Sequence, residues 1–267
     1  MNLQAILFDL DDTLLWDERS VREAFEATCT EASLQYPTLI KPDELEDSVR
    51  KEARSLYESY ETFPFTKMIG INPFEALWGN FTEGDQPEFR ILQELAPTYR
   101  AQSWTRGLSN LGIDDSALGE RLGEMFPAER RKRAFVYEET FHLLDALKGT
   151  YTLLLLTNGS PDLQMEKISG VPQLASYFDH IVISGSFGAG KPDITIFQHA
   201  MDLLGIVPTQ GLMIGDKLTT DILGSNRVGM KNVWINHHII RNDDIIPCYE
   251  INQLNEVLPL IQSISND

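Results

Sequence analysis

Short apolar runs alternate with stretches of helical periodicity in the second half of the chain. The runs cover 151–156, 181–183, 211–214 and 232–235, and a similar one, 5–8, lies near the start. Short continuous apolar runs are typical of strands that are buried on both faces of a parallel sheet. The pattern therefore predicts an α/β fold, a doubly wound parallel sheet in which 5–8 forms a central strand.

Helical patterns with recognisable ends separate these runs. One begins near Pro161, a second extends from Pro192 to Gly205, and a third covers about Thr219 to Val228 and stops at Gly229. Proline suits the first turn of a helix, and glycine suits the left-handed residue that follows its last turn. Strands and helices that alternate in this way indicate βαβ units.

Residues 17–140 lack such apolar runs and show long patterns of helical periodicity instead. Helices are expected around Val21 to Ala32 and Leu45 to Tyr60, from Pro97 to Leu111, and from Ser116 to Phe126. This block interrupts the α/β pattern after the first strand. We therefore expect a core domain made of 1–16 and 141–267, and an inserted helical domain made of 17–140.

The charge of the chain restricts its partners. Lys and Arg number 22 and Asp and Glu number 40, which gives a net charge of −18. This balance argues against binding to nucleic acid or to an anionic membrane surface. No apolar run approaches the length of a membrane span, the first residues lack a secretory pattern, and two cysteines cannot form a disulfide framework. We expect a cytoplasmic protein, as a monomer or a dimer.

Chemically active side chains follow several of the predicted strands and turns. They are Asp9, Asp11, Thr157, Asn158, Lys191, Asp216 and Asp221. Because the carboxyl ends of parallel strands meet at one edge of the sheet, we expect these groups to gather there. A ligand set made only of oxygen favours Mg²⁺, and a hydroxyl with a lysine suits a phosphate group. Two carboxylates two residues apart can take different roles in phosphoryl transfer: one attacks phosphorus, and the other transfers protons.

Four short motifs occur in order along the chain. They are Asp9-Leu10-Asp11-Asp12-Thr13-Leu14, Leu156-Thr157-Asn158-Gly159, Lys191-Pro192, and Gly215-Asp216 with Asp221. The set resembles the motifs of the haloacid dehalogenase (HAD) superfamily, and the resemblance covers about 1–16 and 141–240. It implies a Rossmann-like core, and the inserted block is similar to the helical cap of the first cap class.

The resemblance also implies roles for these residues. Asp9 would be the nucleophile that forms an aspartyl-phosphate, and Asp11 the general acid and base. Thr157, Asn158 and Lys191 would bind the phosphate of a small-molecule phosphate ester. The Mg²⁺ ligands would be Asp9, the main-chain carbonyl of Asp11, and Asp216, with Asp221 supporting the metal shell.

Several alternatives remain open. A 2-haloacid dehalogenase or a phosphotransferase could use the same fold, although dehalogenases of the superfamily lack a carboxylate at the position of Asp11. A phosphate-sensing or scaffold protein without turnover is a third alternative. Phosphoserine is one candidate substrate, because the layout is similar to that of bacterial phosphatases assigned to phosphoserine. The basic cluster 130–133 is either a solvated helix face or a contact for an anionic part of the substrate.

Overall fold

A computed structural model describes residues 2–241 and 244–266. The chain divides into two compact units. The sheet unit consists of Met1–Asp17, Phe135–Gly159 and Lys167–Asp267, and the helical unit consists of Glu18–Ala134 and Ser160–Glu166. Residues 135–140 therefore group with the sheet, whereas the sequence pattern assigns them to the inserted block. Residues 160–166 group with the helices, although they lie far outside that block.

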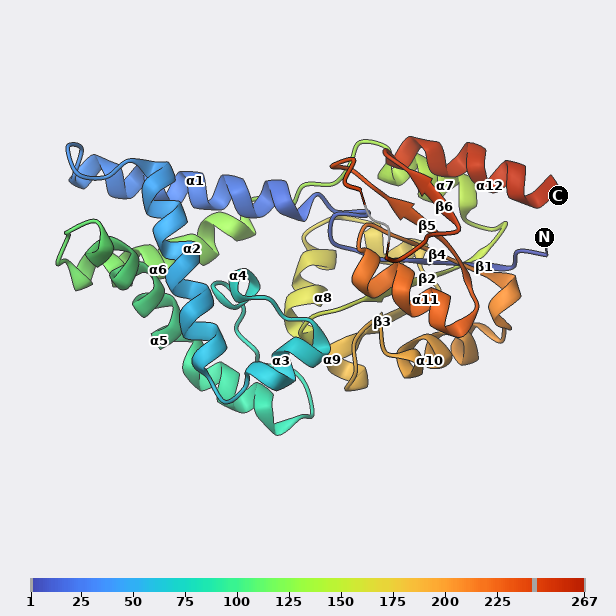
Figure 1. Ribbon diagram of the computed structural model, residues 1–267, viewed down its shortest axis with the longest axis horizontal. Coiled ribbons are helices and arrows are strands. Elements are labelled where there is room, and N and C mark those ends of the chain that lie inside the picture. Colours follow the sequence, from blue (N-terminus) through green and yellow to red (C-terminus); the bar gives the residue numbers. More distant parts are fainter. Residues whose placement is uncertain (1, 242–243, 267) are drawn as a thin grey trace. The chain divides into compact units, whose positions relative to one another are not determined.

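The sheet unit contains a parallel sheet of six strands in the order β3-β2-β1-β4-β5-β6 (Figure 1). The strands are β1 (Ala5–Phe8), β2 (Thr152–Thr157), β3 (His180–Ile183), β4 (Gly211–Gly215), β5 (Lys231–Ile235) and β6 (Tyr249–Ile251). The predicted α/β fold with a central first strand is confirmed, because β1 pairs with both β2 and β4. The sequence pattern did not indicate β6.

Helices cover both faces of this sheet (Figure 1). They include α7 (Thr140–Leu147), α9 (Ser184–Phe187), α10 (Ile194–Leu204), α11 (Leu223–Val228) and α12 (Val257–Asn266), with a π-helical turn η3 (Leu218–Ile222) and the 3₁₀ turns η1 (Leu174–Tyr177), η2 (Pro208–Gln210) and η4 (Leu254–Glu256). Alternate strand residues point to opposite faces. Ile6 and Phe8 therefore join one apolar cluster with α7 and α12, whereas Leu7 joins a second cluster with α10.

Glycine ends two of these helices as the sequence predicts. Gly205 follows α10 with φ 63°, and Gly229 follows α11 with φ 73°. Both lie in the left-handed region, which glycine adopts without a steric penalty. The helix that begins at Pro161 is α8 (Pro161–Ser169). Its residues up to Glu166 group with the helical unit, and those from Lys167 onward group with the sheet unit.

The helical unit has an apolar core of its own, with Phe25 and Trp104 fully buried in it. Its helices are α1 (Asp17–Gln35), α2 (Pro42–Ser59), α3 (Phe63–Ile69), α4 (Pro73–Ala76), α5 (Pro87–Asn110) and α6 (Ser116–Arg131). The expected helix start at Pro97 is wrong, because α5 begins ten residues earlier and contains Pro97 in its interior. Burial of Phe89, Leu92 and Ala96 before the proline offsets the hydrogen bond that proline cannot make.

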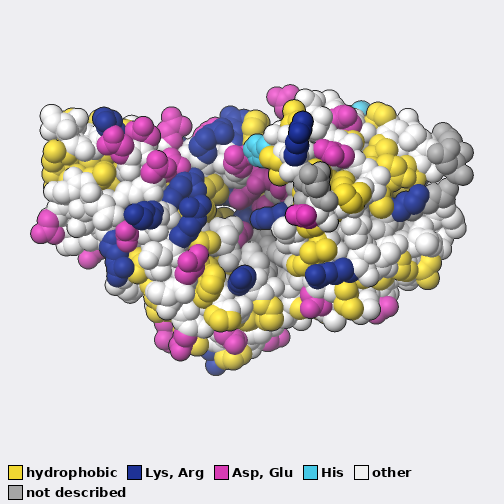
Figure 2. All heavy atoms as spheres, viewed as in Figure 1, with side chains coloured by type: hydrophobic (Ala, Val, Ile, Leu, Met, Phe, Trp, Pro, Cys, Tyr) yellow, Lys and Arg dark blue, Asp and Glu magenta, His cyan; other side chains and the backbone are white. Residues whose placement is uncertain are grey.

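The basic cluster at the end of α6 is not a uniformly solvated face. Arg130 is buried, with its guanidinium 4.6 Å from the centre of the Trp78 ring. Arg131 pairs with Glu166 and donates to the Trp78 carbonyl at 3.1 Å. Both basic and acidic side chains are present over the visible surface of the molecule (Figure 2). Among the described residues, no helix is both long and apolar enough to cross a membrane.

Candidate active site

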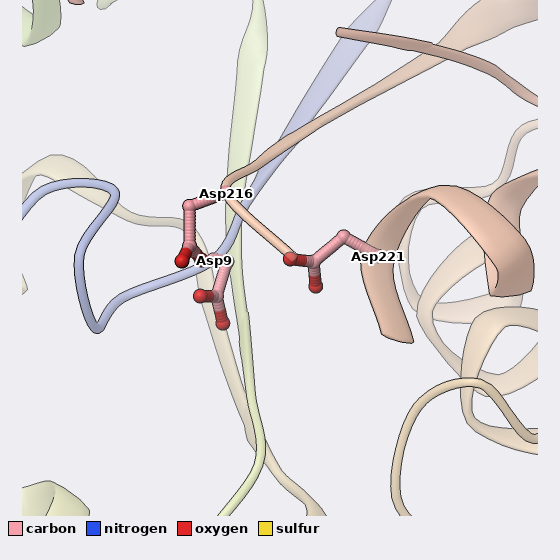
Figure 3. Close-up of side chains that lie close together, drawn as sticks. All are labelled: Asp9, Asp216 and Asp221. Carbon is pink, nitrogen blue, oxygen red and sulfur yellow. The ribbon is translucent and has the colours of Figure 1, made fainter. Parts of the chain in front are cut away.

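Three carboxylates converge at the carboxyl end of the central strands. Asp9 follows β1, Asp216 follows β4, and the Asp9 N–H donates to the Ile214 carbonyl at 2.9 Å, which extends the pairing of the two strands. Asp221 lies in η3 and points toward the other two (Figure 3). One carboxylate oxygen from each residue lies within 4.8 Å of the others. An oxygen-only group of this size can hold a hard divalent cation such as Mg²⁺.

Gly215 makes room for Asp221. A Cβ atom on Gly215 would lie 2.3 Å from Asp221 Oδ2, which is closer than real Cβ atoms approach any neighbour. Asp221 Oδ2 also accepts a hydrogen bond from the Lys217 N–H at 3.0 Å. The glycine that ends β4 is therefore needed because the Asp221 side chain packs directly against the strand.

Lys191 lies between two of these carboxylates. Its Nζ is 2.6 Å from Asp9 Oδ1 and 2.6 Å from Asp221 Oδ1, and it also donates to the Leu156 carbonyl at 2.6 Å. The Lys191 side chain is only 1% exposed. The ammonium is thus fixed by three oxygen atoms, and its charge offsets part of the negative charge of the cluster.

Asn158 holds the Lys191 segment in place. Its Nδ2 donates to the Lys191 carbonyl at 2.9 Å, and its Oδ1 accepts from the Lys191 N–H at 2.8 Å. Both polar ends of the side-chain amide are therefore used by one residue. Thr157, the last residue of β2, is buried at the same edge of the sheet.

Asp11 contacts a lysine that the sequence motifs do not include. Lys167 Nζ lies 2.8 Å from Asp11 Oδ2 and 3.7 Å from Asp17 Oδ1. A signal for Lys167 does exist in the sequence, because it lies one helical turn after the apolar Leu163, which is buried on the same side of α8. A charged residue in the apolar stripe of a helix is uncommon unless it has a charged partner.

Burial sets the protonation of these acids. It raises the pKa of Asp9 to about 6, with Lys191 opposing the rise and the charge of Asp221 adding to it. Burial raises the pKa of Asp216 well above its ordinary value, and the charges of Asp9 and Asp221 add to the effect. The pKa of Asp11 is raised by burial as well, against the influence of Lys167. Ionising several neighbouring carboxylates is unfavourable because their charges repel. A cation bound among them lowers this free-energy cost.

Lys191 shows the complementary effect. Burial by itself lowers the pKa of the ammonium, but the charges of Asp221 and Asp9 outweigh it and raise the pKa above its usual range. The lysine therefore stays charged at neutral pH. A fixed positive charge beside Asp9 suits the binding of an anionic group.

The loop after Asp11 is held by a histidine. Asp12 has φ 56°, a left-handed conformation that aspartate tolerates better than most residues. His237 Nε2 lies 2.9 Å from the Asp12 carbonyl, and the His237 ring stacks on Tyr137 at 4.8 Å between ring centres. These contacts fix the course of the chain just beyond the candidate catalytic residues.

Known proteins are similar to this chain over most of its length. Residues 3–229 match the family model described as haloacid dehalogenase-like hydrolase. A phosphoserine phosphatase of Thermus thermophilus is 31% identical over 256 residues, which are 96% of this chain and 98% of that protein. An N-acylneuraminate-9-phosphatase of Mus musculus is 35% identical over 170 residues, which are 62% of this chain and 68% of that protein.

A solved structure has the same fold. The magnesium-bound crystal structure of the HAD-hydrolase YfnB from Bacillus subtilis aligns with a TM-score of 0.67 at 20% identity, over 98% of this chain and 99% of that one. The family match covers all four motifs, and the relatives at 31% and 35% identity include hydrolases of phosphate esters. The chain is therefore an enzyme that belongs to the haloacid dehalogenase-like hydrolase family.

Proposed function

We propose that this protein is a Mg²⁺-dependent phosphomonoesterase that uses Asp9 as its nucleophile. The observation that carries the proposal is the position of Asp9. It lies at the end of the central strand, 2.6 Å from the buried ammonium of Lys191 and within the acidic cluster with Asp216 and Asp221. A nucleophile beside a fixed positive charge and a candidate metal site is the arrangement that phosphoryl transfer requires.

The donor set fits Mg²⁺. Asp9 and Asp216 supply carboxylate oxygens, and the Asp11 carbonyl is proposed as a third ligand from the protein. Both oxygens of Asp221 already have partners, Lys191 and the Lys217 N–H. Asp221 therefore suits a supporting position around the metal rather than a direct ligand. When bound, Mg²⁺ would neutralise phosphate charge and favour the ionised form of the acids.

The proposed reaction has two steps. In the first, a carboxylate oxygen of Asp9 forms a bond to phosphorus, the bond from phosphorus to the ester oxygen breaks, and Asp11 gives that oxygen a proton. In the second, Asp11 takes a proton from water, the water oxygen attacks phosphorus, and the bond to Asp9 breaks. The products are an alcohol and inorganic phosphate, and Asp9 and Asp11 return to their initial states.

The remaining residues at this edge have supporting roles in the proposal. The Thr157 hydroxyl and the Lys191 ammonium bind phosphoryl oxygens. Asn158 contributes to phosphate binding in two ways: through its main chain, and by holding the Lys191 segment in place. Asp11 favours a phosphatase over a 2-haloacid dehalogenase, because cleavage of a carbon–halogen bond needs no acid to protonate the leaving group.

The relatives guide the choice of substrate. Because a phosphoserine phosphatase matches nearly the whole chain, we propose a small phosphate ester and take phosphoserine as the first one to assay. The two free thiols, Cys29 and Cys248, favour the reducing cytoplasm as the site of action.

The test is phosphate release from a panel of phosphate esters in Mg²⁺ and in EDTA. We expect turnover of at least one ester that depends on Mg²⁺ and is absent in the Asp9→Asn variant. Release that persists in EDTA, or in the Asp9→Asn variant, would refute the mechanism. Binding of esters without any release would indicate a phosphate-sensing protein instead.

A further inference from the structure

A buried lysine contacts the residue proposed as acid and base. Lys167 Nζ lies 2.8 Å from Asp11 Oδ2, and the contact joins positions 156 residues apart in the chain. The Lys167 side chain is 1% exposed, whereas that of Asp11 is 23% exposed. The lysine is thus almost fully enclosed by the protein, whereas the Asp11 side chain is only partly enclosed.

Burial of Lys167 has an energetic consequence. An ammonium taken out of water is costly unless acids compensate its charge, and an aliphatic residue at the same place on α8 would pack without that cost. The lysine is compensated by Asp11 and, at 3.7 Å, by Asp17. A stabilising effect on the helix therefore does not explain a lysine at this position, whereas its interaction with the two acids does.

The orientation of the Asp11 side chain matters for its proposed role. Asp11 lies on the short loop after β1, and an aspartate side chain can rotate about two bonds, so the groups that contact its carboxylate decide which orientation it takes. Transfer of a proton to a leaving oxygen requires one particular orientation, because general acids act only within hydrogen-bond reach. We propose that Lys167 is a positioning residue that holds the Asp11 carboxylate in the orientation used for proton transfer, an inference that rests on the proposed phosphatase function.

Asp17 allows the contact between Lys167 and Asp11 to break and form again. During the reaction Asp11 has to turn toward the ester oxygen and then toward water. If Asp11 were the sole acid beside Lys167, each such turn would leave a buried ammonium without an acid. Asp17 Oδ1 is near enough to keep the lysine compensated while Asp11 moves. The Lys167 ammonium can therefore guide Asp11 without locking it.

The test compares leaving groups in the Lys167→Met variant, which keeps an unbranched side chain one heavy atom shorter and removes its charge and donors. The two substrates are an alkyl phosphate, whose alkoxide cannot leave without a proton, and p-nitrophenyl phosphate, whose phenolate can. The measured quantity is kcat/KM, because it reports the steps up to departure of the leaving group. We expect kcat/KM to fall about 10- to 100-fold for the alkyl phosphate and about 3-fold or less for p-nitrophenyl phosphate.

Two further variants control the test. Lys148→Met removes an exposed lysine of the same unit, whose ammonium contacts the Ser176 carbonyl and the Tyr177 ring, and it should leave both substrates unaffected. Lys167→Gln keeps an N–H donor for Asp11 and should recover part of the loss with the alkyl phosphate. It also serves as the test if Lys167→Met does not fold.

The possible outcomes separate this inference from the proposed function. Absence of phosphate release by the wild-type protein would refute the proposed function. With an active wild type, equal losses for both substrates in the Lys167 variants would mean a general structural role and would overturn the inference. Unchanged or increased rates with the alkyl phosphate would overturn it as well.

Discussion

Lys191 Nζ lies 2.6 Å from Asp9 Oδ1, although 182 residues separate the two in the chain. The contact exists because the strand before Asp9 pairs with β2, whose residue Leu156 also accepts a hydrogen bond from the same ammonium. A nucleophilic carboxylate and a cation that could receive its substrate are thus held together by the sheet itself.

Asp9→Asn should reduce phosphate release by about 10³-fold or more, because an amide oxygen is a poor nucleophile toward phosphorus. The side chains are nearly equal in size, so the fold should persist. Release of inorganic phosphate and far-ultraviolet circular dichroism measure the two effects. An active Asp9→Asn protein with native circular dichroism would show that another residue attacks phosphorus.

Lys191→Met should lower the free energy of unfolding by about 3–5 kcal/mol in EDTA, because it leaves Asp9 and Asp221 as buried acids with no cation beside them. Urea denaturation measures this difference. Lys217→Met is the matched control. Lys217 is exposed, and its main chain rather than its side chain binds Asp221, so this change should cost less than about 0.5 kcal/mol. Similar costs for the two variants would contradict the role given to the Lys191 charge.

The stability of the metal-free protein should fall as pH rises from about 4 to about 6. Folding raises the pKa of Asp9 from 3.8 to about 6, mainly through burial, so in this range the folded protein keeps a proton that the unfolded chain has lost. Stability decreases with pH wherever the folded state binds more protons. Thermal unfolding in EDTA between pH 4 and 7 measures the decrease, and Asp9→Asn should make it smaller.

Added Mg²⁺ should reverse this loss. Because it binds ionised carboxylates, the rise in Tm caused by Mg²⁺ should be larger at pH 7 than at pH 5. An equal rise at both pH values would argue against a metal site that contains Asp9 and Asp216.

Gly215→Ala should weaken Mg²⁺ binding, because the new Cβ would lie 2.3 Å from Asp221 Oδ2 and force that carboxylate away. Titration with Mg²⁺, followed by the shift in Tm, measures the affinity. Gly205→Ala is a useful comparison, since its φ of 63° strains alanine but no atom lies within 4 Å of the new Cβ. It should lower stability and leave Mg²⁺ affinity intact. Unchanged affinity in Gly215→Ala would remove Asp221 from the metal site.

Phe25→Ala should lower the free energy of unfolding of the helical unit by about 3–5 kcal/mol. Phe25 is fully buried, its ring centre lies 4.5 Å from that of Phe126, and the Arg50 guanidinium lies 4.1 Å from its ring. Denaturation followed by tryptophan fluorescence measures the change, because Trp78 and Trp104 of the same core contribute to the signal together with Trp16 and Trp234. Leu34→Ala, at an exposed position of α1, should have little effect. Equal effects of the two changes would mean that Phe25 is not part of a tightly packed core.

Local patterns in the sequence were sufficient for the strands and for the chemistry at their ends. Continuous apolar runs identify β1, β2 and β4, because strands buried on both faces cannot place polar residues on either side. The residue that follows such a run lies at the carboxyl edge of a parallel sheet, and the sequence therefore predicts that Asp9 and Asp216 lie close together. The helix ends at Gly205 and Gly229 could also be predicted locally, because the left-handed conformation needed there is one that glycine by itself adopts readily.

Contacts between distant segments were decided only by the tertiary structure. Helix α5 begins before Pro97 because apolar burial on the preceding turns outweighs the local preference of proline for a first turn. The pairing of Lys167 with Asp11, and the capture of Lys191 by Asn158, depend on segments 156 and 33 residues apart. The sequence by itself determined which chemical groups are present and at which edge of the sheet they lie. Only the folded chain decided their partners, because hydrogen bonds and ion pairs depend on positions within a few ångströms, which periodicity does not fix.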